Sequence, residues 1–375
     1  MEYKNPLVAY IDSNALEHNI NIVKNKFPGK EIILPVKANA YGHGSVLVSR
    51  LAQDCGVNFF ALARINEALE LRNAGINGQM LILGAEWHPD NLKLALEYDI
   101  GLTVSCVEHI EVLEKIAELE NGIFNIHVKL NTGMFRLGVD QDKVAEFAKK
   151  LSHCRKLHVV SAFTHFAKSD EDIETTSEHI KMFGQSLETL KAYGVNPEFY
   201  HLCNSGGVEN LSSDANDIIA GSSAVRPGMM VYGYSQAIDE KTENGLIPVM
   251  NLCSRVVHTR YVKKGTPVGY GATYIVPEDG KLATLALGYG DGFPRALSGK
   301  FCVRINQRNY MQCGRISMDL TVINADENVR VGDEAWIFGS PKYAQMTARD
   351  LAKLCGTISY EITTSVASRV KRSII

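Results

Sequence analysis

Short apolar runs alternate with amphipathic helical patterns along the first two thirds of the chain. One helical pattern places Leu16, Ile20 and Val23 on a single face. Ser13 is its predicted N-cap, and a Pro-Gly pair ends it. The apolar runs have the lengths of buried strands. They cover residues 32–37, 59–63, 80–84, 100–105, 124–130, 159–165, 198–204 and 223–228.

Eight strand candidates, mostly followed by helix candidates, predict an α/β fold with a (β/α)8 TIM-type barrel. Neighbouring parallel strands need crossover connections, and helices supply them. A doubly wound open sheet is the alternative. That fold would favour a Gly-x-Gly-x-x-Gly turn after an early strand, and the sequence contains none.

The pattern changes near Leu246 to short β-rich runs separated by glycine turns, which predicts a compact, mainly β C-terminal domain. One helix follows, with Thr347 as its N-cap and Gly356 as its end. We therefore predict a cofactor-binding barrel over residues 1–243 and a β domain over residues 244–375.

Composition and charge narrow the class of protein. The 375 residues are 45% hydrophobic and 22% charged with a net charge of −3, which is typical of a soluble globular protein and gives no footprint for nucleic acid. No basic cluster or long apolar run points to a membrane, and the N-terminus does not resemble a signal peptide. Eight scattered cysteines without a C-x-x-C pair predict free thiols, no zinc site and a cytoplasmic location.

Reactive side chains fall at the predicted strand ends, where barrel enzymes place their chemistry. These residues are Lys37, Lys129, His165, His201, Asn204 and Arg226. A strand-end lysine usually extends into solvent, and a histidine there is often only a core residue. In a confined pocket, however, the amine of Lys37 is suited to form a Schiff base with a carbonyl.

Two glycine-containing segments follow the last two predicted strands: "NSGG" (204–207) and "VRPGMM" (225–230). Taken alone they could be ordinary turns. In a barrel this is the usual place for a phosphate site made of backbone N–H groups and a hydroxyl such as that of Ser205. A phosphate site together with Lys37 indicates a phosphorylated aldehyde, and pyridoxal 5′-phosphate fits that description.

The chain resembles the alanine racemase family of fold-type III pyridoxal-phosphate enzymes nearly end to end. The resemblance rests on "VKANAYGHG", "VKLNTGMFRLG", "THFA", "HLCNSGG", "VRPG", "GYGATY", "LALGYGDGFPR", "GRISMD" and "GTISYE". It implies a homodimer that interconverts L-alanine and D-alanine and supplies D-alanine for peptidoglycan. It also implies that Lys37 holds the cofactor as an imine, and that Tyr270 from the partner's β domain is the second catalytic base.

The resemblance assigns further roles. Around the cofactor, Arg226 would face the pyridine nitrogen with His201 behind it, His165 would lie beside the ring, and Asn204 would be a further contact. The phosphate would be held by Tyr41, Ser205, Gly228, Met229 and Tyr360. The residues that place the substrate carboxylate and the second base would be Arg136, Met318 and Asp319. Those that line the entrance would be Asp170, Tyr289, Arg295 and Arg315.

Lys129 raises an electrostatic question, because it is expected close to the cation of Arg136. A carbamate on its amine, which the resemblance suggests, would turn the repulsion into attraction; pairing with an acid elsewhere in the chain is the alternative. Asn131 stands where the family usually has Asp, which changes the charge balance around Lys129.

Other functions remain open on the sequence. The substrate could be serine or a broader set of amino acids. The architecture also resembles the basic amino-acid decarboxylases, although those pair the ring nitrogen with a carboxylate where this chain offers Arg226. A non-catalytic pyridoxal-phosphate carrier would be a lone barrel, which the predicted β domain argues against.

Overall fold

Eight parallel strands close into a barrel in the N-terminal lobe of the computed structural model, which describes residues 5–237 and 245–375. Each strand overlaps one of the predicted apolar runs, so the predicted barrel is confirmed. The strands, in the order in which they pair, are β2 (Glu31–Pro35), β3 (Phe59–Leu62), β4 (Gln79–Ile82), β5 (Gly101–Val104), β6 (Phe124–Lys129), β7 (Leu157–Phe163), β8 (Phe199–His201) and β9 (Ala224–Val225), which closes on β2.

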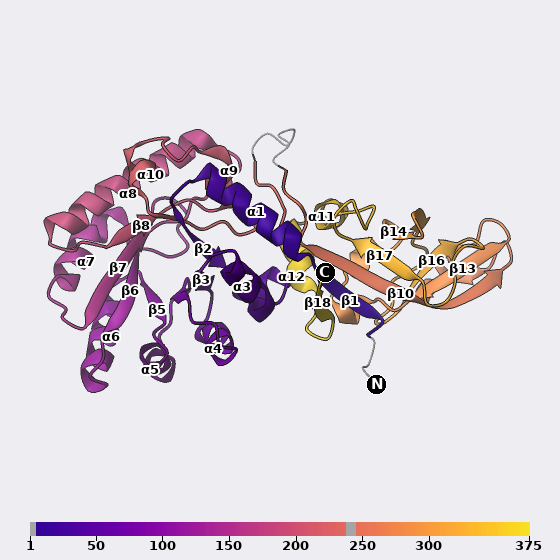
Figure 1. The fold of residues 1–375 in the computed structure, drawn as a ribbon, viewed down its shortest axis with the longest axis horizontal. Helices are drawn as coiled ribbons and strands as arrows, with labels where there is room; N and C mark the ends of the chain where they lie inside the picture. The colour runs from indigo at the N-terminus through magenta and orange to yellow at the C-terminus, as the bar shows by residue number, and fades with distance from the viewer. Residues whose placement is uncertain (1–4, 238–244) are drawn as a thin grey trace.

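Helices surround this barrel (Figure 1). They are α1 (Ser13–Lys26), α3 (Ser45–Asp54), α4 (Ile65–Asn73), α5 (Pro89–Glu97), α6 (Val107–Leu119), α7 (Val144–Leu151), α8 (Ile173–Ala192), α9 (Ser205–Asn210) and α10 (Asp217–Gly221). The short turn α2 (Lys37–Tyr41) lies between β2 and α3.

The predicted cap of the first helix is wrong by one residue. Asp12 is the N-cap of α1, and its carboxylate accepts a hydrogen bond from the Ala15 N–H at 3.0 Å. Ser13 is the first helical residue, and its hydroxyl donates to the carbonyl of Ile375 at 3.1 Å. The serine is thus engaged by the C-terminus of the chain, which local sequence does not reveal.

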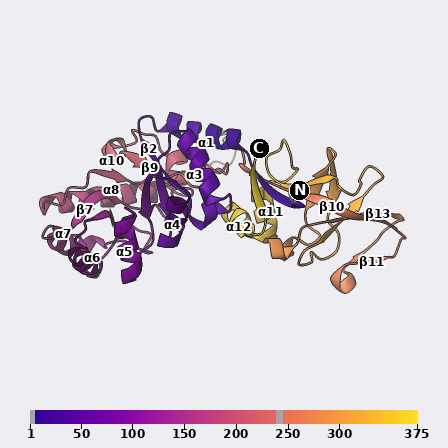
Figure 2. The same ribbon diagram turned by 60° about the horizontal axis from the view of Figure 1, so that its bottom comes forward.

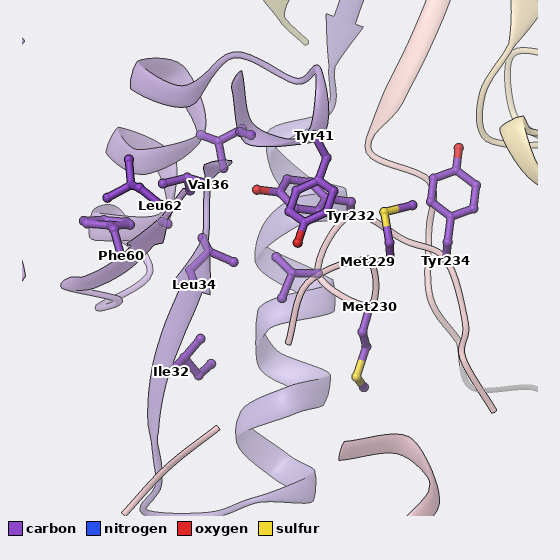
Figure 3. Packing of buried hydrophobic residues seen from close by; sticks show 14 of the residues in the cluster. Ile32, Leu34, Val36, Tyr41, Phe60, Leu62, Met229, Met230, Tyr232 and Tyr234 are labelled. Atoms are coloured by element: carbon purple, nitrogen blue, oxygen red, sulfur yellow. The ribbon is translucent and has the colours of Figure 1, made fainter. Parts of the chain in front are cut away.

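The barrel strands are buried on both faces, as parallel strands in this fold must be. Ile33, Phe59 and Leu81 pack inside the barrel. Alternate residues such as Ile32 and Leu34 belong to the larger core formed with the surrounding helices. Figure 3 shows part of this larger core, with Ile32 and Leu34 of β2 beside the long helix α1 and with Phe60 and Leu62 of β3 farther from that helix.

The C-terminal lobe is mainly β structure, as predicted. Its strands are β10 (Met250–Val262), β11 (Pro267–Val268), β12 (Tyr274–Ile275), β13 (Gly280–Leu285), β14 (Cys302–Ile305), β15 (Arg308–Met311), β16 (Thr321–Ala325), β17 (Glu334–Phe338) and β18 (Lys371–Ile374). Helices α11 (Ala348–Cys355) and α12 (Ser359–Ser365) lie between this lobe and the barrel (Figure 1). Thr347 and Gly356 cap α11 as predicted.

An unexpected strand joins the two ends of the chain. β1 (Leu7–Ile11) pairs antiparallel with β10 and parallel with β18, so residues 7–11 extend the sheet of the C-terminal lobe before α1 enters the barrel. The predicted boundary between residues 243 and 244 lies outside the described residues. The division of the chain at that point stays a prediction.

Within residues 5–237 and 245–375, no helix combines the length and apolar character that crossing a membrane requires.

Candidate active site

A cavity of about 300 Å³ lies at the carboxyl ends of the barrel strands, beside α12. Most of the site residues predicted for the barrel line it, together with one from α12. They are Lys37, Tyr41, Arg136, His165, Asp170, Asn204, Ser205, Arg226, Gly228 and Tyr360. Pro35, Leu83, Gly206 and Gln236 complete the lining without having been predicted. The strand topology therefore gathers residues that are up to 325 positions apart in the sequence, from Pro35 to Tyr360.

Lys37 does not end a strand, as the sequence suggested, but follows Pro35 and Val36 at the start of α2. Its successors Ala38, Asn39 and Ala40 have φ between 51° and 55°, so this turn is left-handed. Such backbone is costly for residues other than glycine. It brings Lys37 and Tyr41 to the same cavity.

Glu67 supports this turn, and sequence reasoning missed it. One carboxylate oxygen accepts from the Ala38 N–H at 2.7 Å, and the other accepts from the N–H groups of Ala63 at 2.7 Å and Arg64 at 3.1 Å. Its place three residues after the N-cap of α4 is a recognisable local signal, whereas its bond to Ala38 is a tertiary contact without one.

The environment of Lys37 makes its amine easier to deprotonate than that of an exposed lysine. Burial lowers the pKa of Lys37, and the neighbouring charge of Arg136 lowers it further. A neutral amine is both a nucleophile and a proton acceptor.

Lys129 is 6% exposed and lies over the ring of Phe163, 5.6 Å from its centroid. Burial, with the charges of Arg136, Arg226 and Lys37, lowers the pKa of Lys129 to about 7. Within the described part of the chain, Lys129 forms no ion pair with a carboxylate. Asn131 instead donates to Asp140 at 2.6 Å and accepts from the N–H groups of Gly133 and Phe135, so it organises the following loop.

Arg226 is 3% exposed, and protein acceptors orient its guanidinium. Nη1 donates to Nδ1 and to the carbonyl of His201, and Nη2 donates to the carbonyls of Thr164 and Leu202. These four bonds account for the Nη hydrogens, so among the described residues the Nε–H is the guanidinium donor without a protein acceptor, and Arg226 lines the cavity. Burial lowers the pKa of Arg226 to about 10, which still leaves it a cation at neutral pH.

Hydrogen-bond donors converge at the phosphate end predicted from "NSGG" and "VRPGMM". The Ser205 hydroxyl accepts from the Gly228 N–H at 2.8 Å. A Cβ placed on Gly228 would lie 3.1 Å from the Tyr41 hydroxyl, so glycine keeps that space open. Burial raises the pKa of Tyr41 and of Tyr360, so both phenols stay protonated donors. Met229 is fully buried and does not line the cavity.

The remaining predicted residues lie on the C-terminal lobe and do not line this cavity: Tyr270, Tyr289, Arg295, Arg315, Met318 and Asp319. Tyr270 is 69% exposed and Met318 is 54% exposed. Tyr270 follows β11, which lies far from the barrel (Figure 2). Within one chain, therefore, the two predicted bases are not brought together.

Some of these residues nevertheless lie close to one another. The Arg315 guanidinium comes within 2.9 Å of the position that a Cβ on Gly271 would take, next to Tyr270. The Tyr289 segment is bonded to the Met318 segment through the Gly290 N–H and the Met318 carbonyl at 2.8 Å. Arg369 fixes Asp319 by an ion pair at 2.7 Å.

Comparison with known proteins agrees with this arrangement. Residues 11–236 match the family model of the alanine racemase N-terminal domain, and residues 249–374 match that of its C-terminal domain. The alanine racemase of Desulforamulus reducens is 36% identical over 376 residues, which cover 98% of this chain and 99% of the relative. This chain belongs to the alanine racemase family.

Solved members of the family share the whole architecture. The alanine racemase of Clostridium difficile is 30% identical with a TM-score of 0.92, over 100% of this chain and 97% of that one. The alanine racemase of Bacillus anthracis, solved with bound L-Ala-P, is 31% identical with a TM-score of 0.91, over 100% of this chain and 96% of that one. Family membership makes this chain a racemase.

Proposed function

We propose that this racemase interconverts L-alanine and D-alanine with pyridoxal 5′-phosphate as its cofactor. The observation that carries the proposal is the cavity itself, which has a lysine with a lowered pKa at one point and a cluster of hydroxyl and N–H donors at another. The similarity to alanine racemases over nearly the whole chain supports alanine as the substrate. Serine or a broader range of amino acids is the second candidate.

The donor set fits the cofactor. Hydroxyls of Tyr41, Ser205 and Tyr360 with the N–H groups near Gly228 and Met229 suit a phosphate dianion, since they are hydrogen-bond donors. Lys37 would hold the aldehyde carbon, His165 would lie beside the ring, and Asn204 would contribute a further contact. When bound, pyridoxal 5′-phosphate supplies the conjugated system that stabilises negative charge at the substrate Cα.

Arg226 would hold the ring nitrogen. Its Nε–H is the guanidinium donor that remains for the cavity, and a guanidinium donates a hydrogen bond without giving up its proton. A ring nitrogen held in this way would stay unprotonated, and this would limit how far negative charge moves away from Cα. This fits racemisation better than decarboxylation of basic amino acids.

Two proton carriers are needed, because inversion removes a proton from one face of Cα and delivers one to the other. Lys37 would serve one face. Tyr270 of a second copy would serve the other, with Arg136, Met318 and Asp319 placing the substrate carboxylate and this phenol. Tyr289, Arg295 and Arg315 from the second copy, with Asp170, would line the entrance.

The physiological role follows as part of the same proposal. A cytoplasmic homodimer of this kind would supply D-alanine for peptidoglycan.

Incubating the cofactor-loaded protein with single enantiomers of alanine, serine and larger amino acids tests the proposal. We expect chiral chromatography to show both alanine enantiomers approaching equal amounts from either direction, with Cα–H exchange in deuterated water. Carbon dioxide release from lysine or ornithine would instead favour a decarboxylase. Cofactor binding without Cα–H exchange would favour a carrier and contradict the proposal.

A further inference from the structure

Three buried polar side chains continue from Arg226 through the interior of the barrel. Nη1 of Arg226 bonds to Nδ1 of His201. His201 Nε2 lies 3.0 Å from Ser161 Oγ, and Ser161 Oγ lies 2.7 Å from His127 Nδ1. His201, Ser161 and His127 come from β8, β7 and β6, and each is at most 2% exposed. They form a continuous row across three neighbouring strands.

The direction of every hydrogen bond in this row follows from the Arg226 end. A guanidinium has no acceptor, so His201 Nδ1 must be the acceptor and the proton of neutral His201 must be on Nε2. That Nε2–H then donates to Ser161 Oγ. The buried Ser161 hydroxyl also needs an acceptor for its own proton, and His127 Nδ1 is the partner that remains. His127 therefore also carries its proton on Nε2.

Both imidazoles are neutral, as a row in which every hydrogen bond has one fixed direction requires. Burial, with the charge of Arg226, lowers the pKa of His201 well below its ordinary value. Burial, with the nearby His158, lowers the pKa of His127 to about 3. A second proton on His201 would place a donor on Nδ1 against the guanidinium, and a second proton on His127 would take away the acceptor of the Ser161 hydroxyl.

The row ends at the opposite side of the barrel from the active site. His127 lines a cavity of about 210 Å³ at the N-terminal ends of the strands, with Asp99, His158 and Glu198. A Cβ on Gly101 would lie 2.5 Å from His127 Nε2, so glycine at this position gives the imidazole its room. The Nε2–H of His127 thus ends the row at this second cavity.

We propose that Ser161 and His127 are positioning residues for Arg226. They hold His201 in the form protonated on Nε2, so that its Nδ1 is always an acceptor for the guanidinium. The guanidinium is thereby kept in the orientation that leaves its Nε–H for the cofactor. The effect on the cofactor rests on the proposed function, whereas the protonation pattern of the histidines does not.

The protonation pattern can be measured directly in the holoenzyme. Histidine labelled with a heavy nitrogen isotope reports by nuclear magnetic resonance which ring nitrogen carries the proton. We expect His201 and His127 to be single, neutral forms protonated on Nε2. A proton on Nδ1 of either ring, or a doubly protonated ring at neutral pH, would overturn the proposal, whether or not the protein racemises alanine.

Substitutions test the consequence for the reaction. In Ser161→Ala the Nε2–H of His201 loses its acceptor, and we expect a mixture of protonated forms for His127. We also expect kcat to fall about tenfold with little change in KM, the size of effect that one lost buried hydrogen bond gives. Thr103→Val is the matched control, since it removes a buried barrel hydroxyl that donates to the Ile82 carbonyl, outside the row.

A second pair of variants covers poor folding of Ser161→Ala. His127→Asn keeps an acceptor close to the position of Nδ1, and His127→Leu removes it. We expect His127→Asn to retain most of the kcat and His127→Leu to lose about as much as Ser161→Ala. Equal kcat in both His127 variants, or a Ser161→Ala variant that matches Thr103→Val in kcat and in its histidine signals, would contradict the positioning role.

Discussion

Positive charge accumulates in the active-site cavity. Lys37, Arg136 and Arg226 line it with one carboxylate, that of Asp170. Lys129 lies close enough for the other three cations to lower its pKa. Such a site favours ligands that bring negative charge, such as a phosphate and a carboxylate. It also favours a carbamate on Lys129, because about half of its amine is neutral near pH 7 and the neutral amine is the form that adds carbon dioxide.

Lys129 predicts a specific dependence of stability on pH. Because its folded pKa is about 7, against an ordinary value of 10.5, the unfolded chain binds one more proton between those values. In buffer free of carbon dioxide, stability should therefore rise as the pH increases from about 7 to about 10. We expect Lys129→Met to be more stable than the parent by up to roughly 5 kcal/mol near pH 6, with the gain fading towards pH 10.

Urea unfolding midpoints across this pH range measure the effect, with Lys115→Met on the exposed face of α6 as the control. Bicarbonate should stabilise the parent and leave Lys129→Met unchanged if the carbamate forms. A parent and a Lys129→Met variant with parallel pH profiles would rule out the lowered pKa.

Turn α2 stores strain next to the reactive lysine. Four consecutive non-glycine residues after Lys37, from Ala38 to Tyr41, have left-handed backbone, which costs roughly 1 kcal/mol for each. Glu67 from α4 and Arg372 from the C-terminal strand hold the turn in place, through the Ala38 N–H at 2.7 Å and the Gly42 carbonyl at 2.9 Å. Neighbouring elements therefore impose this backbone on the active site.

Relieving the strain should stabilise the protein. Ala38 is exposed and has φ 51°, so Ala38→Gly removes the steric penalty without opening a cavity. We expect a gain of about 0.5–1 kcal/mol in the free energy of unfolding, less than the full penalty because glycine also loosens the unfolded chain. In the right-handed helix α7, Ala145→Gly should instead lose about 1 kcal/mol. Thermal unfolding of both variants measures these changes in stability. A loss of stability in Ala38→Gly as well as in Ala145→Gly would show that α2 is not strained.

The contact between α2 and α12 should couple stability to cofactor binding. A Cβ on Gly42 would lie 1.9 Å from the Thr363 carbonyl, so Gly42→Ala must push away α12, which carries Tyr360. Gly75→Ala is the matched control, because Gly75 has a similar φ of 82° and nothing within 4 Å. We expect the control to lose about 1 kcal/mol and Gly42→Ala clearly more.

Titrating each variant with pyridoxal 5′-phosphate completes this test. Gly42→Ala should bind the cofactor more weakly and Gly75→Ala should bind it like the parent. If Gly42→Ala and Gly75→Ala bound the cofactor with equal affinity, the position of α12 would not affect cofactor binding.

The sequence predicted those elements whose determinants are local. Periodicity located all eight barrel strands, and the strand ends located Lys37, His165, Asn204 and Arg226 of the cavity lining. Tyr41, Arg136, Asp170 and Tyr360 came from the family resemblance instead. The errors share one physical cause, since each involves a distant partner. The Ser13 hydroxyl donates to the Ile375 carbonyl, and β1 pairs with β10 and β18. The turn that begins at Lys37 is held by Glu67 and Arg372. No local pattern encodes such contacts.

The two lobes of the molecule each carry part of the proposed catalytic machinery. The barrel carries the cavity, and the β lobe carries Tyr270 and Met318 in the open. Phe135, beside Arg136 of the cavity lining, is 79% exposed as well. Large exposed apolar side chains on both lobes are typical of a surface that another protein covers. A second copy in the reverse orientation would cover both lobes at once, and would complete two equivalent sites.

Mixing two inactive variants tests whether the sites are shared. Lys37→Ala removes one base and Tyr270→Ala removes the other, so each homodimer should lack activity. A heterodimer holds one site with both bases intact and one site with neither. After unfolding and refolding in equal amounts, half of the dimers are mixed, so about a quarter of the parental activity should return. Refolding each variant alone is the control, and a mixture no more active than these controls would show that each chain provides its own second base.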